Sequence, residues 1–180
     1  MFFLENDDVG LRNLVESDAE GNYVNWFNDS EVCKYNSHHR FPMTKLEVQE
    51  YIRNANTNNR NMVFAVIEKK NNTHIGNISL QQINYIDRNA EIAFLFGEKD
   101  FWGKGFATSA AKLLIHHAFM ELGMNRIYFG TSEENKGMQK VGEHLGFMRI
   151  GVNREALYKN GRFLNIYLYD LLKKEYMCKN

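Results

Sequence analysis

The sequence lacks an excess of charge of either sign, because 22 Lys and Arg side chains balance 22 Asp and Glu in 180 residues. A general binder of nucleic acid or of an anionic membrane needs an excess of basic side chains, so this balance argues against both partners. Only two cysteines occur, Cys33 and Cys178, and they stand too far apart for a disulfide framework or a zinc-binding spacing. No apolar run approaches the roughly 20 residues that cross a bilayer, and the first residues do not resemble a signal peptide. We therefore expect a cytoplasmic protein.

Proline is also scarce, with Pro42 alone, and no stretch rich in Pro, Gly or Ser divides the chain. We therefore expect a single domain over residues 1–180. Apolar residues make up 44% of the chain and include 13 Phe, 9 Tyr and 2 Trp, which is enough for a core. The charges are segregated: residues 1–30 hold seven acidic side chains and one basic one, whereas residues 149–180 hold seven basic side chains and three acidic ones. The two segments either are solvated surfaces or act together at a site.

Hydrophobic periodicity and turn signals predict alternating strands and helices. Thr44 and Glu47 form a capping box that opens a helix to about Ala55. From 104 to 122, small and apolar residues recur at steps of three and four, which indicates one buried helix face. Further helices are expected from Ser17 or Asp18 to Phe27 and at 135–145, and strands at 9–14, 62–68, 74–86, 90–96, 127–131, 147–156 and 163–172. This order predicts an α/β (α+β) fold with a mixed sheet.

A glycine-rich turn precedes the long helix. Gly103 and Gly105 let the backbone approach a ligand closely, and the helix N-terminus that follows offers free N–H groups and the positive end of the helix dipole. With Lys104 beside it, the turn is a plausible cradle for phosphate groups. It matches neither a Walker loop nor a dinucleotide fingerprint, because Thr108 stands where the fingerprint has its third small residue. Such a turn can also serve only to pack a helix on a sheet.

The strand before this turn contains a glutamate. Side chains alternate across a sheet, so Glu91, Ala93 and Leu95 share one face, while Ile92 and its neighbours at 94 and 96 form an apolar face. A glutamate in an apolar strand near an anion cradle is a candidate general base. The alternative is a carboxylate on a solvent-facing side of the sheet.

Several segments together resemble the GNAT superfamily of N-acetyltransferases. They are Ala90-Glu91-Ile92, Phe101-Trp102-Gly103-Lys104-Gly105-Phe106-Ala107-Thr108, Glu134-Asn135 and Leu145-Gly146-Phe147, with Arg12, Asp18, Trp26 and 28–32 in the opening segment. The form of the glycine turn is similar to the ribosomal-protein N-terminal acetyltransferase subgroup, which also includes enzymes that acetylate small amines. The resemblance implies a mixed, mostly antiparallel central sheet with helices on both faces, in which the strand at 90–96 splays from the strand at 127–131.

The resemblance also implies acetyl-CoA as co-substrate and direct transfer of the acetyl group to a primary amine. Its pantetheine arm would pair with the first strand of the splayed pair, its pyrophosphate would lie on the glycine turn, and Asn135 would help to hold it. The implied cofactor-binding residues are Phe94, Leu95, Phe96, Gly103, Lys104, Gly105, Phe106, Ala107, Thr108 and Asn135. Glu91 matches the catalytic general base, which acts directly or through water, and the backbone N–H of Leu95 would stabilise the oxyanion.

Two positions depart from the family pattern. Gly142 stands where many relatives have the tyrosine that protonates the leaving thiolate, and Met138 stands where the subgroup often has serine. The general acid is therefore unassigned. The histidines form no ligand cluster, so we expect all six at the surface and no metal.

The family builds its acceptor site from the first helices and the last hairpin. We expect Trp26, Asp29, Glu31, Tyr35 and Arg154 to bind the substrate. Acidic and basic side chains together favour a small amine that also carries negative groups, such as a nucleotide-linked amino sugar. The alternatives are a polyamine, a protein N-terminus, or a degenerate domain that only senses acetyl-CoA. A homodimer is possible.

Overall fold

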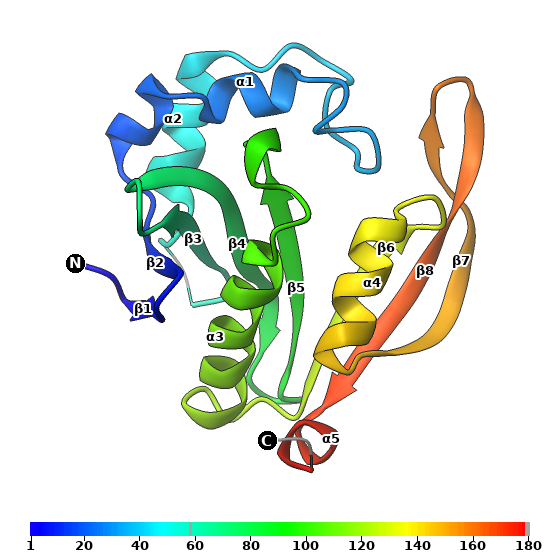
Figure 1. Cartoon of the computed structure of the whole chain (residues 1–180). Coiled ribbons are helices and arrows are strands. Elements are labelled where there is room, and N and C mark those ends of the chain that lie inside the picture. Colours follow the sequence, from blue (N-terminus) through cyan, green and yellow to red (C-terminus); the bar gives the residue numbers. More distant parts are fainter. Residues whose placement is uncertain (58, 179–180) are drawn as a thin grey trace.

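We analysed a computed structural model, which describes residues 1–57 and 59–178 (Figure 1). The described strands form one eight-stranded sheet in the order β1-β2-β3-β4-β5-β6-β8-β7. The strands are β1 (Leu4–Glu5), β2 (Val9–Asn13), β3 (Met62–Glu68), β4 (Thr73–Asn84), β5 (Asn89–Phe96), β6 (Arg126–Ser132), β7 (Met148–Lys159) and β8 (Arg162–Leu172). Neighbouring strands pair antiparallel except β5 and β6, which are parallel. The predicted mixed, mostly antiparallel sheet is confirmed.

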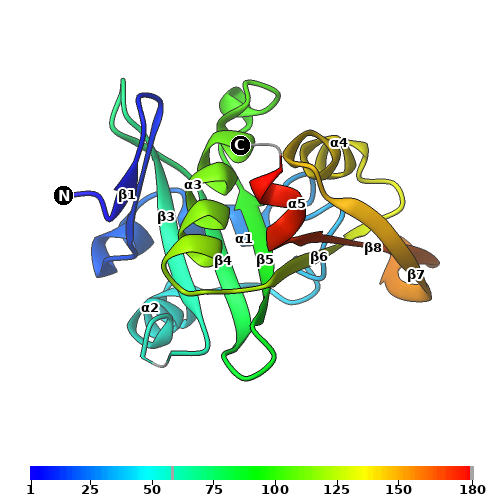
Figure 2. The same ribbon diagram turned by 90° about the horizontal axis from the view of Figure 1, so that it is seen from below.

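Helices cover both faces of this sheet. They are η1 (Glu16–Glu20), α1 (Tyr23–Asn28), α2 (Lys45–Asn54), η2 (Lys99–Phe101), α3 (Phe106–Met120), α4 (Lys136–Leu145) and α5 (Lys173–Met177). One core joins α3 to the sheet, and a second core joins α1 and α2 to the opposite face of β3. Figures 1 and 2 place α5 at the end of the sheet where β5 and β6 meet. No described helix has the length and apolar character needed to cross a membrane.

The parallel pair β5–β6 is a short seam. Only Asn89–Glu91 on β5 pair with Arg126–Tyr128 on β6. Beyond Glu91, β5 continues to Phe96 paired with β4 alone, so its other backbone edge faces away from any described strand. In Figure 1 the two parts of the sheet separate from this seam toward α1 and the β7–β8 hairpin. The predicted splay is therefore present.

The one helix expected from Ser17 or Asp18 to Phe27 is instead two short elements, η1 and α1. Asp18 does not cap a helix as a first residue. Its carboxylate lies inside η1, where it accepts the backbone N–H of Val15 at 2.8 Å and pairs with Arg12 at 2.7 Å. These bonds fix a tight turn at 16–20, and the chain then restarts a helix at Tyr23.

Candidate active site

The seam between β5 and β6 carries the candidate base. Glu91 is half-buried on the face of β5 opposite the first core, as the alternation predicts, because Ile92 on the other face is 1% exposed. The Gln82 side-chain amide donates to Glu91 Oε2 at 3.0 Å. Burial raises the pKa of Glu91 above its ordinary value, and the bond from Gln82 offsets part of that rise. Such a carboxylate is a better proton acceptor than one in water.

A tyrosine lies directly beside Glu91. Tyr128 is its partner across the parallel seam, so both side chains lie on the same face of the sheet. The Arg126 guanidinium lies 4.8 Å from the centre of the Tyr128 ring and donates to Asp170 at 2.7 Å. Burial, and then the charge of Glu91, raise the pKa of Tyr128, so its hydroxyl stays protonated at neutral pH.

The glycine turn forms the N-terminus of α3. Gly103 and Gly105 have φ of 72° and 86°, a region that glycine adopts without steric cost. Gly105 caps the helix, and its carbonyl accepts the N–H of Ser109 at 2.9 Å. The N–H groups of the first helical turn have no helical acceptor, which suits an anion. A Cβ at either glycine would meet nothing within 4 Å, so the backbone is open to a ligand.

The side chains of the residues predicted on the edge of β5 are packed against the protein's own cores. Phe94 and Phe96 pack against the first core, and Leu95 packs against the second. The carbonyl of Phe96 already accepts the indole N–H of Trp102 at 2.9 Å. The free edge of β5 leads from the seam toward the glycine turn. An extended ligand that contains amide groups can form hydrogen bonds with the backbone groups along such an edge.

The segment Glu134-Asn135, one of those that resemble the GNAT family, lies at the start of α4. Asn135 is the N-cap, and its side-chain oxygen accepts the N–H of Met138 at 3.1 Å. Gly142 is buried against β6: a Cβ there would lie 2.5 Å from Phe129 Cζ. The Phe129 ring therefore occupies the space that a side chain at 142 would need. This packing gives a physical reason why no tyrosine stands there.

Three of the five predicted acceptor residues are brought together at two consecutive residues, Glu98 and Lys99. Trp26 is 3% exposed in the second core, and its indole N–H donates to Glu98 at 2.9 Å. Asp29 and Glu31 both pair with Lys99, at 2.8 Å and 2.6 Å, so two carboxylates share one ammonium and the group keeps a net negative charge. The sequence carries no signal for this pairing, because 68 positions separate Glu31 from Lys99.

The other two predicted acceptor residues lie elsewhere. Tyr35 is half-buried, with the Lys34 ammonium 5.1 Å from its ring centre. Arg154 is exposed on β7 and lines a hollow of about 550 Å³ with Glu155 and Asn165. This hollow lies on the β7–β8 hairpin, away from the glycine turn on α3.

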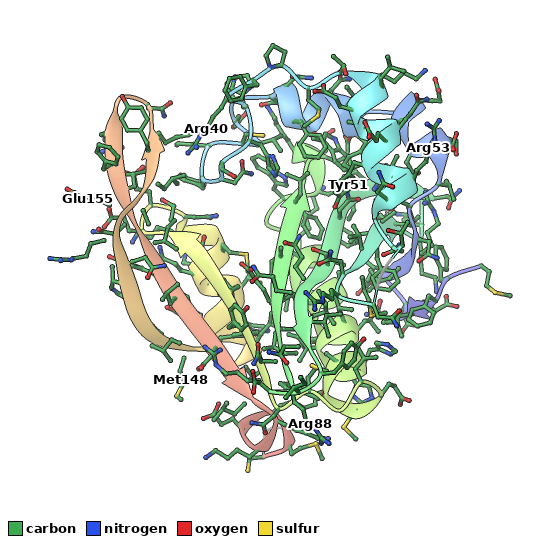
Figure 3. The ribbon with its side chains drawn as sticks, turned by 180° about the vertical axis from the view of Figure 1, so that it is seen from behind. Arg40, Tyr51, Arg53, Arg88, Met148 and Glu155 are labelled. Carbon is green, nitrogen blue, oxygen red and sulfur yellow. The ribbon has the colours of Figure 1, made fainter. Side chains whose placement is uncertain are left out.

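A bridge joins the loop after α1 to the β7–β8 hairpin. The Lys159 ammonium, buried on β7, donates to the carbonyl oxygens of Asn36 and His38 at 3.2 Å and 2.8 Å. Arg40 donates to the carbonyl of Tyr158 at 3.0 Å. Figure 3 shows Arg40 extending from its loop toward the hairpin. The bridge spans the side of the molecule on which the two parts of the sheet separate (Figure 1).

The expectation that all six histidines lie at the surface is wrong for His74. Its side chain is 16% exposed, packs edge-on against Trp26 at 4.9 Å and bonds Asn77 at 2.8 Å. The register of β4 with β3 turns this residue toward the helices that cover the face. Across residues 1–57 and 59–178, no three His, Cys, Asp or Glu side chains are arranged to hold a metal ion.

The fold thus combines a split mixed sheet, a half-buried carboxylate at the split and an open helix N-terminus. The sequence profile of the acetyltransferase (GNAT) domain matches residues 8–148, so the chain belongs to the GNAT acetyltransferases, which use acetyl-CoA. It is 30% identical over 177 residues to the uncharacterized N-acetyltransferase p20 of Bacillus licheniformis, covering 96% of this chain and 97% of that one.

Other relatives carry more specific names. The chain is 39% identical over 101 residues to the putative ribosomal N-acetyltransferase YdaF of Bacillus subtilis, covering 56% of this chain and 55% of that one. It is 29% identical over 115 residues to a spermidine N(1)-acetyltransferase of Vibrio cholerae, covering 64% and 66%. The crystal structure of the Vibrio cholerae spermidine N-acetyltransferase in complex with CoA and spermine superposes with a TM-score of 0.86 at 26% identity, covering 96% of this chain and 99% of that one.

Proposed function

We propose that this acetyltransferase transfers the acetyl group of acetyl-CoA to a primary amine of a small polycation, with a linear polyamine as the first candidate. We infer the substrate class from the charge at the seam between β5 and β6. Within the described ranges Glu91 enters no ion pair, and its carboxylate accepts a hydrogen bond from the neutral amide of Gln82. An uncompensated, half-buried carboxylate attracts a cationic amine.

The basic hairpin supports the same choice. The expectation of an acceptor with negative groups depended on basic side chains that are free to bind an anion. Lys159 is instead bound to backbone carbonyls, and Arg162 pairs with Glu134 at 2.6 Å. Arg162 is compensated in charge by Glu134, whereas the carbonyl oxygens satisfy the hydrogen bonds of Lys159 and leave its charge, and Arg154 stays exposed. The hairpin therefore offers fewer free donors to a phosphorylated or nucleotide-linked amino sugar than the sequence suggests. Relatives named for spermidine add to the case for a polyamine.

The reaction needs a proton acceptor, because an aliphatic amine near pKa 10 is mostly protonated at neutral pH. In this proposal Glu91 takes the proton from the amine, directly or through one water. The first turn of α3 holds the pyrophosphate on its N–H groups, and the free edge of β5 holds the pantetheine arm. Acetyl-CoA supplies the activated thioester. The N–H of Leu95, which the resemblance assigns to the acetyl oxygen, lies on the side of β5 that pairs with β4, because Leu95 pairs with Asn77 and the N–H of Gly97, two residues on, donates to Ile75. The donor to the acetyl oxygen is therefore unassigned.

The first test is a panel of amines with CoA release as the readout. The panel holds spermidine, spermine, a phosphorylated amino sugar and a short peptide with a free N-terminus. We expect the polyamines to give the highest kcat/KM. A preference for the sugar or the peptide would overturn the polyamine assignment and leave acetyl transfer intact, whereas acetyl-CoA binding without turnover on any amine would favour a sensor.

The second test is Glu91→Gln. We expect turnover to fall by about 10² to 10⁴-fold, the usual contribution of a general base, while acetyl-CoA binding measured by calorimetry stays unchanged. Glu50→Gln, an exposed carboxylate on α2, is the matched control and should behave as wild type. Near-normal turnover of the Glu91 variant would contradict the assignment of the base.

A further inference from the structure

The β4–β5 pair contains a bulge beside Glu91. From Gly76 with Phe96 to Gln81 with Glu91 the register is regular, and it shifts before Asn84 pairs with Asn89. Gln82 stands at the shift with a φ of 51°, the left-handed region that side chains other than glycine rarely adopt. The β4–β5 pair thus holds an extra residue on β4 at this point.

The bulge changes which way Gln82 points. Gln81 is the direct partner of Glu91, so in a regular strand Gln82 would project to the opposite face, toward the first core. Instead its side-chain amide reaches Glu91 Oε2 at 3.0 Å, while its backbone N–H donates to the side chain of Asn61 at 3.3 Å. A left-handed residue costs roughly 1–2 kcal/mol, so this geometry is held by its surroundings and not by local preference.

We propose that Gln82 is a positioning residue for acetyl transfer: the bulge at the end of β4 aims its amide at the Glu91 carboxylate and holds that carboxylate at the seam. The inference rests on the proposed role of Glu91 as the base. It does not depend on which amine is the acceptor.

The hydrogen bond from Gln82 to Glu91 determines which carboxylate oxygen is free to accept a proton. The amide uses one lone pair of Oε2, so the other oxygen of the carboxylate is left to take a proton from the amine or from water. A donor bond to the ionised carboxylate favours the ionised form, so it keeps the base ready at a lower pH than burial alone would allow. The other titratable or charged groups on this side are Tyr128 on β6 and, beyond it, Arg126 and Asp170.

The test is Gln82→Gly. Glycine adopts the positive φ without cost, so the variant keeps the bulge and the fold while it removes the amide. We expect kcat to fall by about 5- to 50-fold with KM for acetyl-CoA unchanged. Without the donor bond the pKa of Glu91 rises further, so the acid limb of the kcat/KM profile should move to higher pH by about 0.5 to 1 unit.

Two comparisons make the result specific. Gln81→Ala removes an amide that is bonded to Ser79 at 3.0 Å rather than to Glu91, and it should leave the acid limb in place. Gln82→Asn keeps an amide and tolerates the left-handed conformation, so it should recover part of the loss. An acid limb of Gln82→Gly that coincides with that of wild type would overturn the inference.

The proposed base is tested separately in the same series. If Glu91→Gln keeps its turnover, the base assignment has failed. If Glu91→Gln is inactive while Gln82→Gly is indistinguishable from wild type in both kcat and pH profile, only the positioning role has failed.

Discussion

At the scale of single residues, Gly142 shows how packing decides which chemistry a position can carry. The helix α4 rests on β6 at this glycine, with the Phe129 ring against its backbone. The ring is itself stacked on Tyr169, with centroids 4.9 Å apart and planes 3° apart, so it cannot tilt away without breaking that contact. The space beside position 142 is therefore filled by an aromatic ring of the sheet.

We therefore predict that Gly142→Ala destabilises the protein by about 1–3 kcal/mol, the usual cost of overpacking a core. The measurement is the free energy of unfolding in urea. Gly137→Ala on the same helix is the control, because a Cβ there meets nothing closer than 3.7 Å. The control should be neutral or stabilising, since alanine favours a helix over glycine. Equal effects at 137 and 142 would refute the packing account.

At the scale of elements, the helix α3 combines a structural and a proposed binding role at its first residue. Gly105 is the N-cap in a left-handed conformation, and the open first turn follows it directly. A side chain there would meet no neighbouring atoms, but it would strain the backbone. Any shift of this residue moves the N–H groups that are proposed to hold the pyrophosphate.

We predict that Gly105→Ala costs about 1–2 kcal/mol of stability and weakens acetyl-CoA binding about tenfold or more. Gly123→Ala is a matched control beyond the other end of α3. It also has a positive φ, 66°, and open space around its Cα. It should show a similar loss of stability with the affinity for acetyl-CoA unchanged. If both variants bind acetyl-CoA equally well, the first turn of α3 is not the phosphate site.

Most elements could be predicted from the sequence because their signals are local. The capping box of Thr44 and Glu47 opens α2, and the small residues at steps of three and four mark the buried face of α3. Alternation alone gave the two faces of β5, with Glu91 opposite the core. The two-residue strand β1 and the five-residue helix α5 were missed, since such short elements carry almost no periodic signal.

The site was less predictable because its key contacts join distant segments. Lys99 pairs with both Asp29 and Glu31, and Lys159 binds carbonyls of a loop more than 100 positions earlier. Composition shows that these charges exist, but not which partners they contact. The bulge at Gln82 is also invisible, because a glutamine in a strand gives no sign of a left-handed backbone.

At the scale of the whole molecule, the net charge of zero conceals a set of local ion pairs. Among the described residues, Glu16, Asp18 and Glu20 of the acidic first segment pair with bases on nearby elements, and Arg162 of the basic last segment pairs with Glu134. Arg154 of the last segment stays exposed. Surface pairs of this kind contribute little to stability.

The short seam between β5 and β6 has a consequence for the order of chemical events. Cys33 is buried with its Sγ 3.1 Å from the Trp26 carbonyl, so it is not placed to carry an acetyl group, and the proposed transfer uses no covalent intermediate. Donor and acceptor must then meet at the seam, one along the edge of β5 and one from the Glu91 face. Initial-rate plots against one substrate at several fixed levels of the other should give intersecting lines, whereas parallel lines would reveal a covalent acetyl-enzyme.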